Sequence, residues 1–438
     1  MDLTQFQTFR VAACDLNGRM RGKRLPAAHA DKLSTGSVRM PLSSLNLDIF
    51  GADIENSPLV FDTGDIDGVL LPTDRGPVPL PWLDVPQGLV PMVMHHEDGT
   101  PFAGDPRHAL VSVLDRYAAK GWHVQAATEL EFTLVDGKGN TLKNIRDPRN
   151  GRRMKSPGIL SLGQMDAFDG FLSALYNAGM EMGLPVETAV SEAGIGQFEL
   201  TLHHQNALRA ADDTWLFKTL IKGLARQHGY VATFMAKPIA DEPGSAMHIH
   251  HSVLDVKTGE NIFVDADGEE TAPFQHFIAG LQNHMPSALA VIAPYVNSYR
   301  RYVKDHAAPI NLEWGRDNRT TGIRVPLSGP KSRRVENRLA GMDCNPYLGI
   351  AASLACGYLG LIQQKDPLPE FKGDAYVGEG DIPQVLGQAL DLFEEATELH
   401  EVLGPDFARV YSIVKRAEYE EFLQVISPWE REHLLMNV

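Results

Sequence analysis

Two glutamates, Glu129 and Glu131, lie two residues apart in the stretch A-T-E-L-E-F-T-L-V-D over residues 127–136. The stretch is rich in apolar and β-branched residues, which predicts a β-strand. Because residues i and i+2 of a strand point to the same face, both carboxylates leave the sheet on one side. Like charges side by side destabilise a sheet. The pair is therefore either a charged strand face in water or part of a site that also supplies cations.

The chain has 438 residues, which is too long for one typical domain, and a formal net charge of -16. This acidic balance argues against nucleic acid or an anionic membrane surface as a partner. The three cysteines have neither metal-site nor disulfide-framework spacing. No stretch has the character of a signal peptide or a membrane span. We therefore expect a soluble, cytoplasmic protein with no nucleic-acid and no membrane partner.

The first hundred residues predict a small, strand-rich unit. Two strands flank the turn signal Asn17-Gly18, and short apolar runs between Gly and Pro residues continue to the turn that starts at Asp98. We place a boundary near residue 100, which gives an N-terminal domain over 1–100 and a larger domain over 101–438. In the larger domain, apolar periodicity predicts strands alternating with helices, the helices at about 107–121, 165–182, 213–228 and 345–364.

Further ligand-type side chains recur at strand spacing. S-E-A-G-I-G-Q-F-E-L supplies Glu192 and Glu199, M-H-I-H-H-S supplies His248 and His250, and R-R-V-E-N-R-L supplies Arg334, Glu336 and Arg338. Each has a simple alternative, since buried polar groups are normally satisfied by hydrogen bonds. Together they offer five carboxylates and an imidazole, which could not all stay ionised side by side unaided. Oxygen-rich sets of this kind suit Mg²⁺ or Mn²⁺, which commonly clamp nucleotide phosphates.

Arginines are dense in the third quarter of the chain. They lie in N-S-Y-R-R-Y-V-K-D-H, G-R-D-N-R-T-T-G-I-R-V-P and S-G-P-K-S-R-R-V-E-N-R-L. A charge run is usually a solvated face, but several of these arginines have strand-like apolar neighbours, where burial demands a partner. Arginine binds phosphate and carboxylate with two parallel hydrogen bonds. The chain has no P-loop and no G-x-G-x-x-G motif, so a nucleotide would be held in another way.

Taken together, these motifs resemble those of the glutamine synthetase family, and the resemblance covers nearly the whole chain. The matching motifs are E-x-E, E-x-x-x-x-G-Q-x-E, K-P with G-S-x-M-H-x-H-x-S, N-S-Y-x-R, N-R-x-x-x-I-R and R-x-E-x-R, in the family's order. The resemblance implies an α+β fold, with an N-terminal β-grasp domain and a catalytic domain whose antiparallel sheet forms a funnel flanked by helices. It also implies a homo-oligomer, which we expect to be a dodecamer of two hexameric rings with active sites between subunits.

The family's reaction has two steps: ATP phosphorylates the γ-carboxylate of L-glutamate, and an amine then displaces the phosphate. The resemblance implies two or three Mg²⁺ or Mn²⁺ ions per site. By resemblance, Glu131, Glu192 and Glu199 hold one metal; Glu129, His248 and Glu336 hold the metal that bridges the transferring phosphate; Gly244, Arg301 and Arg338 bind glutamate; Arg319, Arg324 and Arg334 face ATP and the transferring phosphoryl group; and His250 and Ser252 lie beside the nucleotide.

Two positions depart from the ammonia-using members of the family. Ala307 stands where those members carry a flap glutamate that helps to deprotonate ammonium. Pro41 stands where a neighbouring subunit supplies an aspartate, although Asp48 lies close by in sequence. Loss of both anions weakens a site for a small cation and leaves room for a substituted amine. The pattern is therefore similar to that of ligases that join glutamate to polyamines or alkylamines, with Asp305, His306 or Glu192 as candidates to deprotonate the amine.

Two other hypotheses remain open from the sequence. An ammonia-using glutamine synthetase would need an amine site rebuilt from other residues. A catalytically inactive relative would be expected to have lost metal ligands, and all six are present. Tyr376 lies roughly where some bacterial members carry a modified tyrosine, but its flanking residues differ. We expect Tyr376 to be an ordinary surface residue, because most exposed loop residues have no special role.

Overall fold

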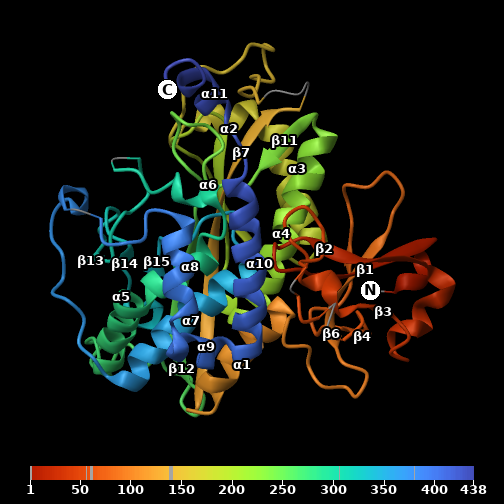
Figure 1. Ribbon diagram of the computed structural model, residues 1–438, viewed down its shortest axis with the longest axis horizontal. Helices are drawn as coiled ribbons and strands as arrows, with labels where there is room; N and C mark the ends of the chain where they lie inside the picture. The colour runs from red at the N-terminus through yellow and green to blue at the C-terminus, as the bar shows by residue number, and fades with distance from the viewer. Residues whose placement is uncertain (1, 56, 60–62, 138–141, 305, 379) are drawn as a thin grey trace.

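Two β-sheets organise the chain in this computed structural model (Figure 1), which describes residues 2–55, 57–59, 63–137, 142–304, 306–378 and 380–438. The first sheet has six strands in the order β2-β1-β6-β4-β3, with β5 paired to β6. Its strands are β1 Thr8–Cys14, β2 Met20–Pro26, β3 Arg39–Pro41, β4 Asp67–Pro72, β5 Val78–Pro79 and β6 Gly88–His95. The predicted hairpin at Asn17-Gly18 is confirmed: β1 and β2 pair antiparallel, and Gly18 takes a φ of +76°, which suits glycine.

The second sheet has nine strands in the order β13-β14-β15-β12-β7-β9-β8, with β10 and β11 also paired to β7. Its strands are β7 Trp122–Asp136, β8 Val186–Ser191, β9 Gln197–Leu202, β10 Gln205–Asn206, β11 Tyr230–Thr233, β12 Met247–Asp255, β13 Trp314–Arg316, β14 Ile323–Val325 and β15 Val335–Asn337. The predicted E-x-E strand, the strand that carries His248 and the strand that carries Glu199 are confirmed. The two sheets together with the helices confirm the α+β class.

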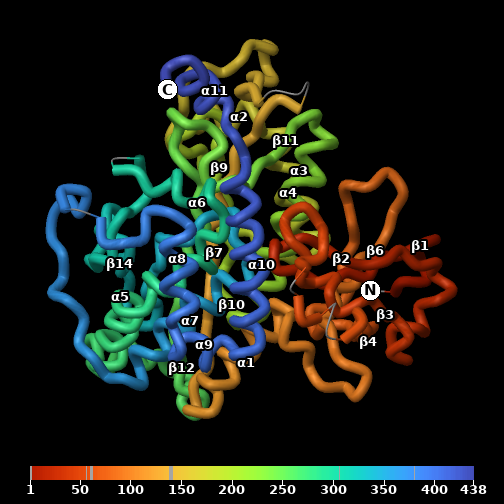
Figure 2. The backbone as a smooth tube through the Cα atoms, viewed as in Figure 1, coloured from red at the N-terminus to blue at the C-terminus, as the bar shows by residue number. Residues whose placement is uncertain are grey.

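Helices pack against the large sheet on the face opposite the glutamates. Along β7, Val124, Ala126, Thr128 and Leu130 are buried, whereas Glu129 on the other face is half-buried. Helices α1, α4 and α7 contact the central strands, and α5 packs along α7. The α-helices are α1 Pro106–Ala118, α2 Leu162–Ala167, α3 Asp169–Glu181, α4 Ala207–Gln227, α5 Ala272–Ile292, α6 Val296–Tyr299, α7 Pro346–Gln363, α8 Leu386–Glu394, α9 Thr397–Leu403, α10 Pro405–Leu423 and α11 Pro428–Leu434. In Figure 2 the first hundred residues gather at the right, beside this larger body. The division at residue 100 stays a prediction.

Helix ends explain where the predicted helices were right and wrong. The helix predicted over 345–364 is confirmed, because the Asn345 side chain accepts hydrogen bonds at the N-terminus of α7. The helix predicted over 165–182 is two helices that meet at Phe168, which has a non-helical backbone. The helix predicted from 213 begins six residues earlier, at Ala207, because Asn206 caps it. The surface prediction for Tyr376 was wrong, since that residue is 8% exposed.

Helix α7 is the one described helix with the length and apolar composition of a membrane span. Of its 18-residue apolar window, 89% is buried inside the protein. The apolar character of α7 is therefore accounted for by its position in the core, where it packs against α1, α4 and α5.

Candidate active site

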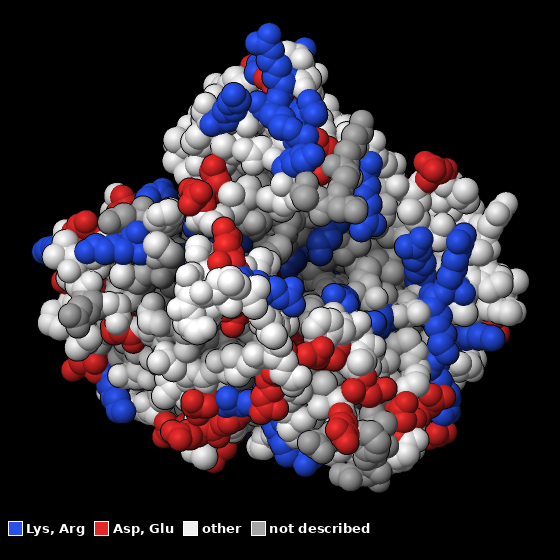
Figure 3. Space-filling view, turned by 45° about the horizontal axis from the view of Figure 1, so that its top comes forward, with Lys and Arg blue, Asp and Glu red and all other residues white. Residues whose placement is uncertain are grey.

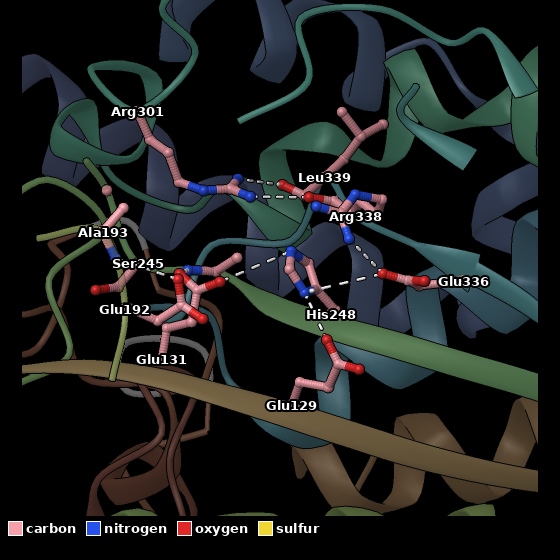
Figure 4. A network of polar contacts seen from close by, with 12 residues as sticks. Glu129, Glu131, Glu192, Ala193, Ser245, His248, Arg301, Glu336, Arg338 and Leu339 are labelled. Atoms are coloured by element: carbon pink, nitrogen blue, oxygen red, sulfur yellow. Dashed lines mark hydrogen bonds and ion pairs between the residues drawn. The ribbon is translucent and has the colours of Figure 1, made fainter. Parts of the chain in front are cut away.

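Strand register places the predicted ligand residues side by side across the large sheet. His248 of β12 pairs directly with Glu129 of β7, and Glu131 of β7 pairs with Glu199 of β9. On the other side of β12, His250 pairs with Glu336 of β15. Paired residues of neighbouring strands have adjacent Cβ atoms, so their side chains meet on one face. These six predicted polar groups therefore form a continuous row, of which Figure 4 shows Glu129, Glu131, His248 and Glu336.

Glu129 is the centre of this row. Its carboxylate accepts hydrogen bonds from His248 Nδ1 at 2.8 Å and from His250 Nε2 at 2.9 Å. Burial alone would raise its pKa, but the hydrogen bonds from the two imidazoles outweigh burial and lower the pKa of Glu129. Arg334 Nε donates to His250 Nδ1 at 3.2 Å, which orients that ring. Glu129 is therefore held ionised and pointing into the site.

Glu336 lies at the other end of the row and is fully buried. It accepts from Arg338 Nη1 at 2.5 Å and from Arg324 Nη1 at 2.6 Å. Burial opposes its ionisation, but the charges of His250 and Arg338 lower the pKa of Glu336 to about 2. The Nε atoms of Arg338 and Arg324 are buried without a hydrogen-bond partner in the described chain. Unpaired guanidinium nitrogens of this kind need an anion, which a substrate can supply.

The remaining three glutamates have raised pKa values, in contrast to Glu129 and Glu336. Burial, followed by the charge of Glu192, raises the pKa of Glu131 to about 8. Burial, followed by the charges of Glu129 and Glu131, raises the pKa of Glu199 to about 9. Burial also raises the pKa of Glu192, which the nearby Arg319 partly offsets. Carboxyl groups that cannot all ionise side by side are typical of a site that binds a cation.

The donor set fits divalent cations. In the described chain, the ligand atoms of Glu129, Glu199 and His248 lie within 4.8 Å of one another, as do those of Glu129, His250 and Glu336. Carboxylate oxygens with one imidazole match Mg²⁺ or Mn²⁺ better than Zn²⁺. These two groups of ligand atoms differ from the sets of metal ligands that the resemblance implies. Glu199 is grouped with Glu129 and His248, and His250 is grouped with Glu129 and Glu336.

Gly244 and Arg301 form the wall of a narrow cavity that Glu131 and Ala307 also line. Arg301 is 2% exposed, and its guanidinium donates to the carbonyls of Leu339 at 2.9 Å and Arg338 at 2.8 Å. A Cβ at position 244 would clash with the carbonyl oxygen of Ala236 and would lie 2.7 Å from Arg301 Cγ, so glycine is required there. The cavity has a volume of about 30 Å³.

Gly244→Ala is therefore expected to displace Arg301. Overpacking of a tight site costs about 1–3 kcal/mol. Because Arg301 faces the proposed glutamate site, we expect a rise of roughly tenfold in the KM for glutamate with little change in the KM for ATP. Initial rates with each substrate varied in turn measure this. An equal rise in both KM values would show a general loss of structure instead.

A second cavity, of about 420 Å³, lies beyond Glu129 on the β12 side. His250, Ser252 and Arg334, which the resemblance assigns to the nucleotide site, line this cavity. Arg324 lies at the edge of the row, where it also pairs with Asp317 at 2.6 Å. Arg319 is exposed in the turn between β13 and β14. Eleven predicted residues of the row and the two cavities are thus brought together. The charge of Arg319 lowers the pKa of Glu192, but Arg319 is not among the described residues that line either cavity.

The structure describes only some of the residues that we expect near the amine. Asp305 lies outside the described residues. Ala307, with a φ of +64°, and Ala308 line the narrow cavity beside Glu192. Pro41 ends β3, at the edge of the N-terminal sheet, and Asp48 accepts from two backbone amides of its own loop. Neither Pro41 nor Asp48 is among the described residues that line either cavity of the site.

Gln197 is a site residue that the analysis of the sequence missed. Its amide donates to Gly244 O at 2.8 Å, to Ser245 Oγ at 3.2 Å and to Glu131 Oε2 at 3.4 Å. It therefore ties the glycine segment to the acidic row. Its place in the G-Q-F-E motif, two residues before Glu199, was the signal that could have identified it.

Known proteins share this fold and its sequence. The family model for the glutamine synthetase catalytic domain matches residues 103–434. The chain is 35% identical to γ-glutamylputrescine synthetase PuuA of Escherichia coli, over 98% of this chain and 91% of that protein. It is 32% identical to a glutamine synthetase of Halobacterium salinarum, over 97% and 93%. Among solved structures, ligand-free GmaS aligns with a TM-score of 0.85 at 30% identity, covering 99% of this chain and 97% of GmaS.

The chain therefore belongs to the glutamine synthetase family. It is an ATP-dependent ligase that forms carbon–nitrogen bonds. Members of this family use glutamate, ATP and an amine or ammonia, together with divalent metal ions. The buried carboxylate row and the unpaired arginine nitrogens are the features that this chemistry needs.

Proposed function

We propose that the chain joins the γ-carboxylate of L-glutamate to a polyamine or an alkylamine, through γ-glutamyl phosphate, with release of ADP and phosphate. The observation that carries this proposal is the pair of methyl groups, from Ala307 and Ala308, that lines the cavity beside Glu131 and Glu192. An ammonium ion needs anions around it, whereas the carbon chain of a substituted amine packs against methyl groups. The 35% identity with a γ-glutamylputrescine synthetase supports the same amine class.

The acidic row would hold the metals, two or three per site. We assign Glu131, Glu192 and Glu199 to one metal, and Glu129, His248 and Glu336 to another, with His250 close enough to contribute. When bound, such cations neutralise the charge of the nucleotide phosphates and of the transferring phosphoryl group. The two imidazoles keep Glu129 ionised, and Arg338 with Arg324 keeps Glu336 ionised.

Glutamate would bind between Gly244, Arg301 and Arg338. Arg301 is fixed by two backbone carbonyls, and Arg338 by Glu336, so both guanidinium groups are positioned before substrate arrives. Such preorganisation avoids the entropic cost of ordering long side chains on binding. Because the cavity of about 30 Å³ is smaller than glutamate, the segment that carries Ala307 and Ala308 must move when substrate enters.

ATP would occupy the cavity of about 420 Å³. His250 and Ser252 would lie beside the nucleotide, while Arg334, Arg324 and Arg319 would face its phosphates and the γ-phosphoryl group in transfer. Arginines stabilise charge that spreads over the phosphoryl oxygens in the transition state. The amine would then displace phosphate from the acyl carbon and lose a proton to Asp305, His306 or Glu192. Of these, Glu192 lies in the wall of the cavity that Ala307 and Ala308 line, which places it beside the proposed amine position.

The oligomer that we propose is a dodecamer of two hexameric rings. Pro41 and Asp48 lie in the N-terminal sheet and line neither cavity of the same chain's site. This placement supports a site completed by the N-terminal domain of a neighbouring copy. Light scattering of the purified protein gives the number of chains directly.

Metal binding is expected to release protons. Glu131 and Glu199, with pKa values of about 8 and 9, are protonated at pH 7 in the metal-free chain, and a cation binds only the ionised forms. Mg²⁺ or Mn²⁺ binding at pH 7 should therefore release about two protons per chain, and affinity should rise from pH 6.5 to 8.5. Calorimetric titration in two buffers of different ionisation enthalpy measures this release. Glu199→Gln should reduce it by about one proton, and release of none would contradict the site.

Product identification tests the proposal as a whole. The chain is incubated with ATP, L-glutamate, Mg²⁺ and either putrescine or methylamine, and the products are analysed by mass spectrometry. The expected result is a γ-glutamylamide together with ADP and phosphate. Formation of glutamine from ammonium, with no amide from any substituted amine, would identify an ammonia-using glutamine synthetase instead.

A further inference from the structure

A separate cavity, of about 870 Å³, lies between the N-terminal sheet and helix α4. Its walls come from the β1–β2 turn, from Trp82 and Leu89 of the N-terminal region, from α4 and from β11. It shares no described lining residue with the two cavities of the candidate active site. The function proposed above does not use this cavity.

The lining of this cavity is basic. Helix α4 contributes Lys218, Lys222 and Arg226 at spacings of four residues, which places them on one helix face. The N-terminal sheet contributes Arg10 and Arg19. None of the five forms an ion pair with a carboxylate in the described chain. In a protein of net charge -16, five unpaired cations around one cavity call for an anionic partner.

The ammonium groups of Lys218 and Lys222 both lie over the same aromatic ring, which brings two positive charges near each other. The Nζ atoms of Lys218 and Lys222 each lie 5.3 Å from the centre of the Phe234 ring. Lys218 also donates to the carbonyls of Met342 at 2.7 Å and Cys344 at 3.2 Å, so it cannot move away freely. The Lys222 side chain is accessible to water within the open cavity, but the surrounding walls, and then the charge of Lys218, lower its pKa to about 8. A bound anion would relieve this repulsion.

The remaining lining sets the kind of anion. Asp343 is the one acidic residue in the described lining, and its carboxylate accepts from Ser298 Oγ at 2.7 Å. Trp82, Leu80 and Met20 provide apolar walls that suit a carbon skeleton. Figure 3 shows basic side chains gathered around a hollow beside the N-terminal part of the molecule. The volume of about 870 Å³ is that of a pocket for a small molecule.

We propose that this cavity binds a small organic polyanion, with two or more carboxylate or phosphate groups that pair with the cations of α4 and of the N-terminal sheet. Tyr295 and Asn297 also line the cavity, at the start of helix α6. Arg301, in the glutamate wall of the active site, follows two residues after α6. A bound polyanion therefore contacts the segment that leads to Arg301.

Calorimetric titration of the full-length, metal-free protein tests the site. Tricarballylate, with three carboxylates, probes carboxylate recognition, and fructose 1,6-bisphosphate, with two phosphates, probes phosphate recognition. At least one probe should bind with one site per chain, and Lys222→Gln combined with Arg226→Gln should weaken that probe at least tenfold. Lys120→Gln removes an exposed lysine elsewhere and should change the affinity less than twofold. Arg334→Gln, which removes a cation from the nucleotide cavity, should also change it less than twofold.

A labelling measurement on the wild-type protein covers the case in which the double variant does not fold. The same probe should slow acetylation of Lys222 by acetic anhydride at pH 8 at least threefold, as followed by mass spectrometry, and should leave Lys120 unaffected. Absence of binding by every probe would overturn the proposal. Equal protection of both lysines would do the same, as would loss of binding in Arg334→Gln, which would place the anion in the active site.

Discussion

Glu129→Gln is expected to lower the rate of glutamate-dependent phosphate release roughly a thousandfold, because preorganised charge at a transition state contributes about that much. Glu129 is the residue common to both groups of ligand atoms in the described chain. It is also the acceptor for both His248 and His250. The substitution keeps the side-chain shape but removes the negative charge, so both groups lose the same ligand.

The fold should survive this change. The row contains more negative charge than it can ionise, so the loss of one carboxylate relieves repulsion on Glu199. A matched control is Glu97→Gln, which neutralises an exposed glutamate paired with Arg39 in the N-terminal sheet. That variant should keep full activity. If phosphate release by Glu129→Gln were unchanged while its circular dichroism matched wild type, the assignment of the metal ligands would be wrong.

Ala307→Glu is expected to shift the preference between ammonium and a substituted amine by roughly 10- to 100-fold toward ammonium. A carboxylate about 4 Å from a cation at a partly solvated site attracts it with about 4 kcal/mol before desolvation is counted. A net gain of about 1.4–2.8 kcal/mol corresponds to the expected ratio. The longer side chain also fills space beside Ala308 that the carbon chain of a larger amine would need.

Ala307→Gln separates charge from size. Position 307 has a φ of +64°, so either substitution places a larger non-glycine residue in the left-handed region at a similar conformational cost. The glutamine variant should lose activity with large amines without gaining activity with ammonium. The measurement is kcat/KM for ammonium and for putrescine in the three proteins. A glutamine variant that behaves like the glutamate variant would show that the shift comes from size and not from charge.

The sequence predicted the acidic row because strand periodicity determines which face a side chain occupies. Glu129 and Glu131 share a face by their spacing, and so do His248 and His250. The partners across strands could not be derived from spacing alone. The register His248–Glu129 depends on how β12 packs against β7, which is a tertiary property. The resemblance to a family placed Glu129 with His248, and Glu131 with Glu199, in shared sets of metal ligands, and the register pairs the members of each set across strands.

Local sequence patterns could not predict several other features of the structure. The pairing of His250 with Glu129 depends on a strand register that no single stretch encodes. Tyr376 was expected at the surface as an ordinary loop residue, yet the chain folds it against the core, where it is 8% exposed. The early start of α4 depends on the Asn206 cap, which a search for apolar periodicity alone overlooks. Helices α8 to α11, in the last quarter of the chain, were not predicted individually.

The central claim is that a substituted amine, and not ammonium, is the nucleophile. The most direct test is the rate of phosphate release from ATP, with L-glutamate and Mg²⁺, across ammonium, methylamine, isopropylamine, ethanolamine, putrescine and spermidine. The account predicts that at least one substituted amine exceeds ammonium at least tenfold in kcat/KM, because methyl groups stand where anions would be needed to hold ammonium. A higher kcat/KM for ammonium than for every substituted amine would contradict the account.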